Sequence, residues 1–406
     1  MDIRPGYKQS EVGVIPEDWE ADELGRFWGV KDCKHVTALF IANGYPLASI
    51  KEVQKRFVDL DDSKQTTLRF YNLLIEGGRK PRVGDLILSR NATVGEVAQV
   101  AEWHPPFAMG QDVCLLRKKT SRLSTDYLQS IFRSSIVVNQ FLDLMVGSTF
   151  KRANVEQIRT LVVPMPPYEE QRAIAEALSD ADGLIESLEQ LLSKKRQLKQ
   201  GAMQELLTGK KRLPGFSGEW HTKRLGDIAH IKTGSRNNQD KVEEGEFPFF
   251  VRSLTVERIN SYSHDCEAIL VPGEGNIGRI FHYISGRFDV HQRVYAITQF
   301  LPGISGQYVY FSMVDSFGNY AMQNSVKATV DSLRLPTFQS FEIFMPPTAS
   351  EQTAIATVLS DMDADISALE AKLTKARAIK QGMMQELLTG NIRLIKRKPL
   401  SAERGL

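Results

Sequence analysis

The chain has little cysteine, no long apolar run and almost no net charge, and each shortage excludes a class of protein. Its three cysteines, Cys33, Cys114 and Cys266, are odd in number and far apart. That argues against a disulfide framework and predicts a reducing, cytoplasmic location. The sequence contains no run of about 18 apolar residues, so it predicts no membrane-spanning helix. Residues 1–13 lack the apolar region of a secretory signal. A net charge of only +2 over 406 residues excludes a global basic field. Positive charge for nucleic-acid binding must therefore be local.

The sequence also lacks a convincing catalytic or metal-binding motif. Residues 273–278 (GEGNIG) fit the GxGxxG pattern of dinucleotide-binding proteins, but the residues after them are typical of a strand, so we expect a turn. Residues 166–168 (PPY) resemble part of an adenine methyltransferase motif, yet Met165 stands where that motif has Asp or Asn. There is no P-loop, and residues 264–266 (HDC) have no second pair of ligands. We therefore predict no catalytic residue and no metal site.

A long internal repeat is the main feature that the sequence does contain. Residues 171–213 and 352–394 align without a gap and are identical at 26 of 43 positions. Their period of 181 residues is too long for a solenoid and indicates a duplicated module. Each copy follows a Met-Pro-Pro, at 165–167 and 345–347, whereas the segments between the copies are far less similar.

Each copy of the repeat predicts a long helix. Apolar or small residues recur at alternating spacings of 4 and 3, which is the a/d pattern of a coiled coil. Proline pairs stand before the expected helix starts, and Gly209 and Gly390 stand where the helices should end. The predicted seam consists of Ile174, Leu178, Ile185, Leu188 and Leu192 in the first copy and Ile355, Leu359, Ile366, Leu369 and Leu373 in the second.

Gly201 and Gly382 fall inside these predicted helices, at equivalent positions of the two copies. Glycine in a helix interior costs about 1 kcal/mol relative to alanine. Two interpretations are open: a tolerated break in the helix, or a close backbone approach to another helix or to a partner protein.

The charge pattern of the repeat predicts how its two helices pair. Residues 169–190 carry a net charge of −6 and residues 191–212 a net charge of +6. In the second copy, residues 350–371 carry −5 and residues 372–393 carry +4. Antiparallel pairing sets each acidic half beside a basic half, so we predict an antiparallel coiled coil within one chain. Each exposed pair contributes only about 0.3–0.5 kcal/mol. The same pattern also suits the helix dipoles, which favour acids at the start and bases at the end.

The segments outside the repeat predict two globules of mixed α and β structure. Each begins with a W-x4-L-G motif, at 19–25 and 220–226. Alternating apolar runs around a glycine-containing turn predict a β-hairpin in each, at 84–97 and 267–280. Strand-like and then helical patterns follow in both, at 111–116 with 127–144 and at 291–297 with 307–322.

Polar and basic residues in the expected loops are candidates for DNA contact. Arginine suits the major-groove edge of guanine, and asparagine or glutamine suits adenine. Basic loops also bind phosphate, which positions the protein without specifying sequence, and each residue alone could be an ordinary solvated side chain. The candidates are Lys51, Ser89, Arg90, Asn91, Gln111, Lys151 and Arg152 in the first globule and Lys232, Arg236, Asn237, Asn238, Arg252, Arg279, His291, Gln292, Arg293 and Lys327 in the second.

The duplicated set of motifs resembles the specificity subunit of Type I restriction–modification enzymes. It comprises the W-x4-L-G starts, the sequences PPYEEQRAIA and PPTASEQTAIA, and the two QELLTG endings; the second Pro-Pro motif has one extra residue before its glutamine. The resemblance covers nearly the whole chain and implies an α+β architecture. Two target recognition domains would be joined by two long helices in an intramolecular antiparallel coiled coil with pseudo-twofold symmetry. The expected boundaries are 1–165 and 213–345 for the recognition domains, 166–212 and 346–395 for the helices, and 396–406 for a basic tail.

The resemblance also implies a function and partners. The subunit would be non-catalytic and would bind double-stranded DNA, each domain recognising one half of a bipartite asymmetric site, with the helices fixing the spacer. Two modification subunits, which use S-adenosylmethionine to methylate adenine at N6, would pack on the helices. Two restriction subunits, which use ATP and Mg²⁺, would join them, in a system of phage defence. The alternatives are a coiled-coil scaffold that binds no DNA and a fused methyltransferase or nuclease, which the missing catalytic motifs disfavour.

Overall fold

The computed structural model describes residues 3–90, 95–145, 152–324 and 332–395. The candidates Asn91, Lys151 and Lys327 and the tail 396–406 lie outside these residues. The chain divides into two compact units, Met1–Ser187 with Leu373–Leu406 and Leu188–Lys372. The two long helices, α6 (Tyr168–Leu206) and α11 (Ala349–Leu388), each contribute one half to each unit.

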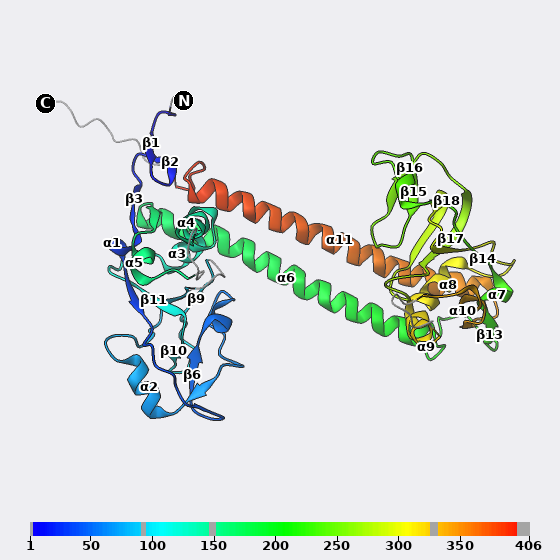
Figure 1. Cartoon of the computed structure of the whole chain (residues 1–406), viewed down its shortest axis with the longest axis horizontal. Helices are drawn as coiled ribbons and strands as arrows, with labels where there is room; N and C mark the ends of the chain where they lie inside the picture. The colour runs from blue at the N-terminus through cyan, green and yellow to red at the C-terminus, as the bar shows by residue number, and fades with distance from the viewer. Residues whose placement is uncertain (1–2, 91–94, 146–151, 325–331, 396–406) are drawn as a thin grey trace. The chain divides into compact units, whose positions relative to one another are not determined.

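The first unit contains a globule with two four-stranded sheets (Figure 1). One has the strand order β4-β11-β8-β9 and the other β10-β6-β7-β5, and two-stranded pairs β1-β2 and β12-β3 lie beside them. The strands are β1 (Tyr7–Ser10), β2 (Gly13–Pro16), β3 (Glu20–Glu23), β4 (Trp28–Asp32), β5 (Phe40–Ile41), β6 (Tyr45–Ala48), β7 (Gln65–Thr66), β8 (Leu86–Ser89), β9 (Val97–Gln99), β10 (Ala108–Met109), β11 (Val113–Lys118) and β12 (Val162–Met165). The helices are α1 (Leu24–Phe27), η1 (Ile50–Val53), α2 (Leu68–Ile75), α3 (Thr125–Phe132), α4 (Ser135–Met145) and α5 (Val155–Arg159).

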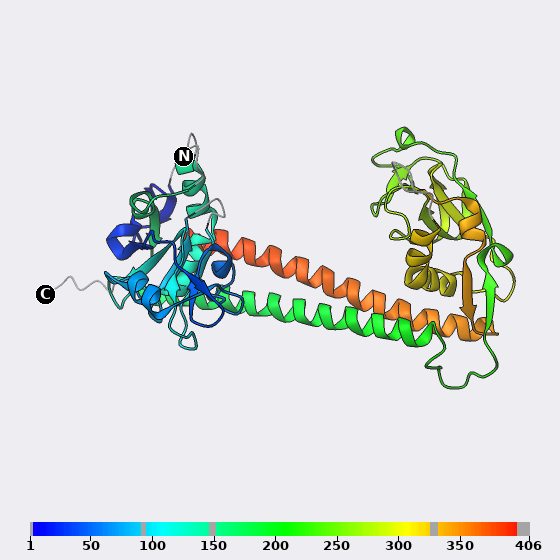
Figure 2. The same ribbon diagram turned by 60° about the horizontal axis from the view of Figure 1, so that its bottom comes forward.

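The second unit contains a globule with one six-stranded sheet, in the order β14-β19-β17-β18-β15-β16, and the pair β13-β20 (Figure 2). The strands are β13 (His221–Arg224), β14 (His230–Thr233), β15 (Phe247–Phe250), β16 (Glu257–Ile259), β17 (His264–Pro272), β18 (His282–Val290), β19 (Val294–Thr298) and β20 (Glu342–Met345). The helices are α7 (Leu225–Ile228), η2 (Asn238–Asp240), α8 (Gly306–Ser312), η3 (Met313–Phe317), α9 (Gly318–Gln323) and α10 (Leu335–Gln339). Both predicted hairpins are present, as β8-β9 and β17-β18. The GxGxxG segment is a turn followed by strand β18, as expected.

Strands β8 and β17 each contain an apolar run that is covered on both faces, at 86–88 in β8 and at 268–271 in β17. In β8, Leu86 and Leu88 belong to one core cluster, whereas Ile87 between them belongs to another. In β17, Ile269 and Leu270 divide between two clusters in the same way. Strand residues alternate between the two faces of a sheet, so a doubly covered strand needs an uninterrupted apolar run.

A glutamine of the repeat anchors each globule to its helix. Gln171 accepts a hydrogen bond from the Ser124 amide at the start of α3 (2.9 Å) and donates to the Pro166 carbonyl (2.9 Å). Gln352 makes the equivalent bonds to the Ser305 amide (2.9 Å) and the Pro346 carbonyl (3.1 Å). The repeat therefore carries the attachment of the globules as well as the helices.

The halves of α6 and α11 pack antiparallel within each unit, as the charge pattern predicts (Figures 1 and 2). In the second unit, Lys195 pairs with Asp365 (2.7 Å) and Lys199 with Asp363 (2.5 Å), so the residue numbers rise along one helix as they fall along the other. In the first unit, Lys380 of α11 pairs with Asp182 of α6 (2.5 Å). Each basic half thus lies beside an acidic half.

Burial of the seam residues does not simply follow contact with a globule. Ile174 and Leu178 belong to the core cluster of the first globule, and Ile355 and Leu359 belong to that of the second. Leu192 and Leu373 are also buried, at 7% exposure, although they belong to neither of these two clusters. The fully buried seam residues are Ile174, Leu178, Leu192, Ile355, Leu359 and Leu373, and the half-buried ones are Ile185, Leu188, Ile366 and Leu369.

Two arginines of the repeat form ion pairs that we call the helix-end clamps. Arg212, after α6, makes two bonds to the Glu351 carboxylate near the start of α11 (2.7 and 2.8 Å). Arg393, after α11, makes two bonds to the Glu170 carboxylate near the start of α6 (2.5 and 2.6 Å). Both glutamates are almost fully buried. Each copy of the repeat therefore supplies the arginine for the glutamate that immediately precedes the other copy.

The glycines of the repeat have two different roles. Gly209 and Gly390 have positive φ angles of 69° and 72° just past the helix ends, which glycine adopts without strain. Gly201 and Gly382 lie inside continuous helices, so the interpretation as a helix break is wrong. A Cβ at either position would meet nothing within 4 Å among the described residues, which excludes a close approach by another part of that structure.

Candidate nucleic-acid interface

Arg236 lies on the loop that leaves β14 in the second unit. Gly234 opens this loop so close to Val290 that a Cβ would lie 1.9 Å from the Val290 carbonyl oxygen, so a side chain has no room. The Arg236 amide then donates to the Val290 carbonyl (3.2 Å), and the Gln292 amide donates to the Arg236 carbonyl (2.8 Å). These contacts fix the loop beside the turn between β18 and β19.

Asp289 fixes the direction of the Arg236 side chain from beneath. Its fully buried carboxylate accepts hydrogen bonds from Arg236 Nε (3.0 Å), Ser261 (2.8 Å) and Ser263 (2.7 Å). Burial raises the pKa of Asp289, but these bonds and one from the Val290 amide outweigh it and hold the pKa below the usual value. Asp289 is therefore a charged anchor that keeps Arg236 in one orientation at the surface.

Four further candidates, Asn237, Arg252, Gln292 and Arg293, are linked to Arg236 through a series of contacts that includes the turn between β18 and β19. The Gln292 side-chain amide donates to the side-chain oxygen of Asn237. Glu274, in the turn after β17, pairs with Arg293 (2.9 Å) and with Arg252 (3.4 Å). The structure thus joins residues from four loops into one polar surface, which carries three arginines and two side-chain amides.

The remaining candidates of the second unit are placed differently. His291 is 6% exposed, and its Nδ1 accepts a hydrogen bond from the Arg293 amide (3.0 Å). Burial, and then the charges of Arg252 and Arg293, lower the pKa of His291. Its ring supports the turn and is closed to a ligand. The candidates Lys232, Asn238 and Arg279 are exposed, and no side-chain hydrogen bond joins them to the polar surface among the described residues.

In the first unit, Arg90 is enclosed by protein. Its side chain is 6% exposed, with Nη1 on the Asp32 carboxylate and Nε donating to the Ala153 carbonyl (3.2 Å). Burial, and then the charge of Arg152, lower the pKa of Arg90. Ser89 is also buried. Neither side chain is offered to solvent.

The accessible candidates of the first unit are Lys51, Gln111 and Arg152. Lys51 and Gln111 are exposed and line one hollow of about 560 Å³, together with Asp112. Arg152 pairs with Asp112 (3.1 Å) and is about one-third exposed. The structure therefore brings these candidates to one surface, on loops that correspond in chain order to those of the second unit.

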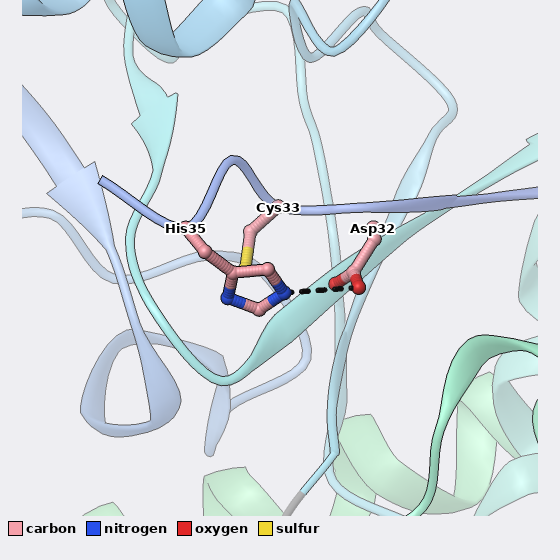
Figure 3. A group of neighbouring side chains, drawn as sticks. All are labelled: Asp32, Cys33 and His35. Carbon is pink, nitrogen blue, oxygen red and sulfur yellow. Dashed lines mark hydrogen bonds and ion pairs between the residues drawn. The ribbon is translucent and has the colours of Figure 1, made fainter.

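Asp32, Cys33 and His35 bring their ligand atoms within 4.8 Å of one another at the end of β4 (Figure 3). His35 Nε2 lies 3.2 Å from the Asp32 carboxylate, which also binds the buried Arg90 guanidinium. A metal ion here would face that fixed positive charge, and burial raises the pKa of the Cys33 thiol, which disfavours the thiolate. The cluster is better suited to holding Arg90 than to holding a cation.

The sequence patterns missed the acidic anchors Asp32, Asp289 and Glu274. The sequence around Asp289 does indicate burial, because Asp289 stands between the apolar residues Phe288 and Val290. Both of these neighbours are fully buried in the structure. A buried carboxylate needs a charged or hydrogen-bonding partner. Which arginine supplies that partner depends on tertiary contacts that spacing does not show.

Comparison with known proteins assigns the family. A sequence model described as the Type I restriction modification DNA specificity domain matches residues 16–195 and 217–377. The chain belongs to this family. The match occurs twice, and each match runs from a W-x4-L-G start into a long helix, so the duplication corresponds to two specificity domains.

Known specificity subunits match either part or nearly all of the chain. A putative type I restriction enzyme MjaX specificity subunit from Methanocaldococcus jannaschii is 25% identical over 96% of this chain and 97% of its own length. The type I restriction enzyme EcoDI specificity subunit from Escherichia coli is 28% identical over 42% of this chain and 37% of its own length. The crystal structure of a Type-I restriction-modification system S subunit from M. genitalium has a TM-score of 0.65, with 15% identity over 95% of this chain and 98% of that chain, which shows a shared fold.

Membership in this family gives the chain a coarse function. It is a non-catalytic specificity subunit with a DNA-recognition role in a type I restriction–modification complex. Among the described residues, no helix is both long enough and apolar enough to cross a lipid bilayer.

Proposed function

We propose that the chain binds double-stranded DNA and that each globule recognises one half of a bipartite, asymmetric site. The observation that carries this proposal is the contrast between the two parts of the chain. The repeat attaches both globules through equivalent glutamines and clamps both helix ends through equivalent ion pairs. The candidate loops differ in residue type at almost every position. Equal attachment with unequal loops suits two recognition modules that read different sequences.

The polar surface of the second unit has the chemistry of a major-groove reader. Arg236 is oriented by Asp289, and a fixed guanidinium can make the paired hydrogen bonds that select guanine. Gln292 and Asn237 carry neutral amides, which suit adenine. Arg252 and Arg293 share one carboxylate, so their excess positive charge is available to phosphates.

The paired helices are proposed as the spacer and as the docking surface for two modification subunits. Leu184, Leu191 and Leu198 recur every seven residues on α6 and are 42–54% exposed, so they form an apolar stripe outside the seam. Leu198 and Gly201 line a hollow of about 580 Å³, to which Met362 of α11 also contributes. An open glycine beside an apolar residue allows a partner helix to approach closely, which supports the second interpretation of the two interior glycines.

The complete complex would act in the cytoplasm in defence against phage. The modification subunits would supply N6-adenine methylation with S-adenosylmethionine, and two restriction subunits would supply ATP- and Mg²⁺-dependent cleavage. The chain itself would direct both activities to the site.

Methylome sequencing of cells that carry the chain with its modification subunits tests this proposal. We expect methylated adenines within one consensus made of two short specified segments separated by an unspecified spacer. A matched strain that lacks only this chain controls for other methyltransferases. Methylation with no bipartite consensus would refute the proposal, as would an unchanged methylome in the control strain.

A further inference from the structure

Three backbone hydrogen bonds frame one turn in the first unit. The Gly110 amide donates to the Ala48 carbonyl (2.8 Å), which continues the parallel pairing of β10 with β6. The Arg90 amide donates to the Asp112 carbonyl (2.9 Å), and the Ala153 amide donates to the Arg90 carbonyl (2.9 Å). The turn at residues 110–112 is thus held on both sides by neighbouring loops.

The same three bonds recur in the second unit with different residues. The His291 amide donates to the Phe250 carbonyl (3.0 Å), after the parallel pairing of β18 with β15. The Gly273 amide donates to the Arg293 carbonyl (2.9 Å), and the Leu333 amide donates to the Gly273 carbonyl (2.8 Å). Residues 110–112 therefore correspond to residues 291–293, at the 181-residue period of the helical repeat.

A glutamine occupies the middle of this turn in both units. Gln111 and Gln292 are both exposed, although the residues on either side of them differ between the units. Asp112, next to Gln111, has a φ of 65°, a conformation that is costly outside glycine. A strained residue that the surrounding structure holds in place is a feature of functional sites. The shared frame places the two glutamines at equivalent positions of the turn, although Arg293, the counterpart of Asp112, does not have a positive φ.

The surroundings of each glutamine suit contact with a base beside the phosphate backbone. Gln292 is aligned by its hydrogen bond to Asn237, and the Arg236 guanidinium belongs to the same loop. Gln111 shares its hollow with Lys51. In each unit a neutral amide, which can donate and accept, therefore lies near a cationic side chain, which can bind phosphate.

We propose that Gln111 and Gln292 are equivalent specificity-determining residues, each contacting the major-groove edge of an adenine at the corresponding position of its own half-site. This inference rests on the proposed function. The glutamine amide matches the donor and acceptor of adenine N6 and N7. The two halves then share this adenine and differ beside it, because Asp112 of one unit is replaced by Arg293 in the other.

The test is the methylome of the complete complex with Gln111→Ala or Gln292→Ala in this chain. Each variant should relax one adenine position of one half-site and leave the other half unchanged. Loss of one paired contact should reduce discrimination at that position on the order of 10- to 100-fold. The relaxed positions should lie equally far from the methylated adenine in the two halves. Gln9→Ala and Gln339→Ala, which remove exposed glutamines elsewhere in each unit, should change no position.

A binding measurement separates base contact from phosphate contact. With the purified complex, Gln111→Ala should weaken binding to the wild-type site on the order of 10- to 100-fold and leave the salt dependence unchanged, because it removes no charge. Lys51→Ala, in the same hollow, should weaken binding to all DNA and reduce the salt slope by about 1.

The outcomes distinguish this inference from the proposed function. A wild-type complex with no bipartite consensus would refute the proposed function. A bipartite consensus that both glutamine variants leave intact would refute only this inference. Relaxation at non-equivalent positions, or at a base other than adenine, would also overturn it.

Discussion

The helix-end clamp between Arg393 and Glu170 should contribute strongly to the stability of the first unit, and Arg393→Met tests this. The Glu170 carboxylate is 2% exposed and accepts from Trp19 Nε1 (3.0 Å) as well as from Arg393. Removing one partner of a buried ion pair costs about 3–5 kcal/mol. Because the Arg393 side chain is 25% exposed, water can reach the vacated carboxylate, so we expect the lower value of about 2–3 kcal/mol.

A double-mutant cycle with Glu170→Gln isolates the pair itself. The double variant has no charge left at residue 170, although Asp18 still loses its two bonds to Arg393 (3.0 Å). Its loss should therefore fall short of the sum of the single losses by about 1–2 kcal/mol. Urea unfolding of the purified chain, followed by tryptophan fluorescence, measures these changes, since Trp19 donates to the same carboxylate. Arg172→Met removes the exposed pair with Glu169 (3.5 Å) and should cost less than about 0.5 kcal/mol. A loss for Arg393→Met as small as this control, or strictly additive singles, would refute the reasoning.

Three further predictions concern the helices and the polar surface. Gly201→Ala and Gly382→Ala should each stabilise the chain by up to about 1 kcal/mol in thermal unfolding, because the new methyl group meets no atom of the described residues within 4 Å. Tryptophan at either position should instead prevent copurification with the modification subunit. Destabilisation by alanine would contradict this prediction. Replacing Lys195 and Lys199 with glutamate should lower the free energy of unfolding in urea by about 1 kcal/mol, and replacing their aspartate partners with lysine as well should restore it. A free energy of unfolding that neither change alters would contradict charge-selected pairing. The lowered pKa of Asp289 contributes stability that is present above the unfolded pKa near 3.8 and is lost as the pH falls through the lower folded pKa. Asp289→Asn should therefore lower the urea midpoint at pH 7 and reduce the decrease of that midpoint between pH ~4 and ~2. An acid unfolding profile equal to that of the wild type would contradict the assignment.

Much of the scaffold was predictable because its signals are local and repeated. The a/d spacing and the opposed charge halves of the repeat predicted helices and their antiparallel pairing, and the ion pair of Lys199 with Asp363 confirms the pairing. The turn between β17 and β18 was predictable from glycine positions. The helix-end clamps were not predicted, although Arg212 and Arg393 stand at equivalent positions of the repeat. Pairing one copy's arginine with the other copy's glutamate requires knowing where each helix ends.

The recognition surface was less predictable because it depends on long-range partners. Arg90 and His291 have the residue types of DNA readers, yet both are buried, and Arg90 is held by Asp32, which lies 58 residues away in sequence. Arg236 remains at the surface because Asp289 holds it from beneath. Residue type identified which side chains could bind DNA, whereas exposure and the acidic anchors decide which of them are presented.

The central claim is that sequence recognition belongs to the non-repeating globules, one half-site to each. Exchanging residues 20–165 for the corresponding segment of another specificity subunit tests it most directly, because this cut keeps Asp18 and Trp19, which contact the helix-end clamp of Arg393 and Glu170. Methylome sequencing of the chimaeric complex should show one half of the consensus replaced and the other half with its spacer unchanged. An unchanged consensus, or a change in both halves, would contradict the account.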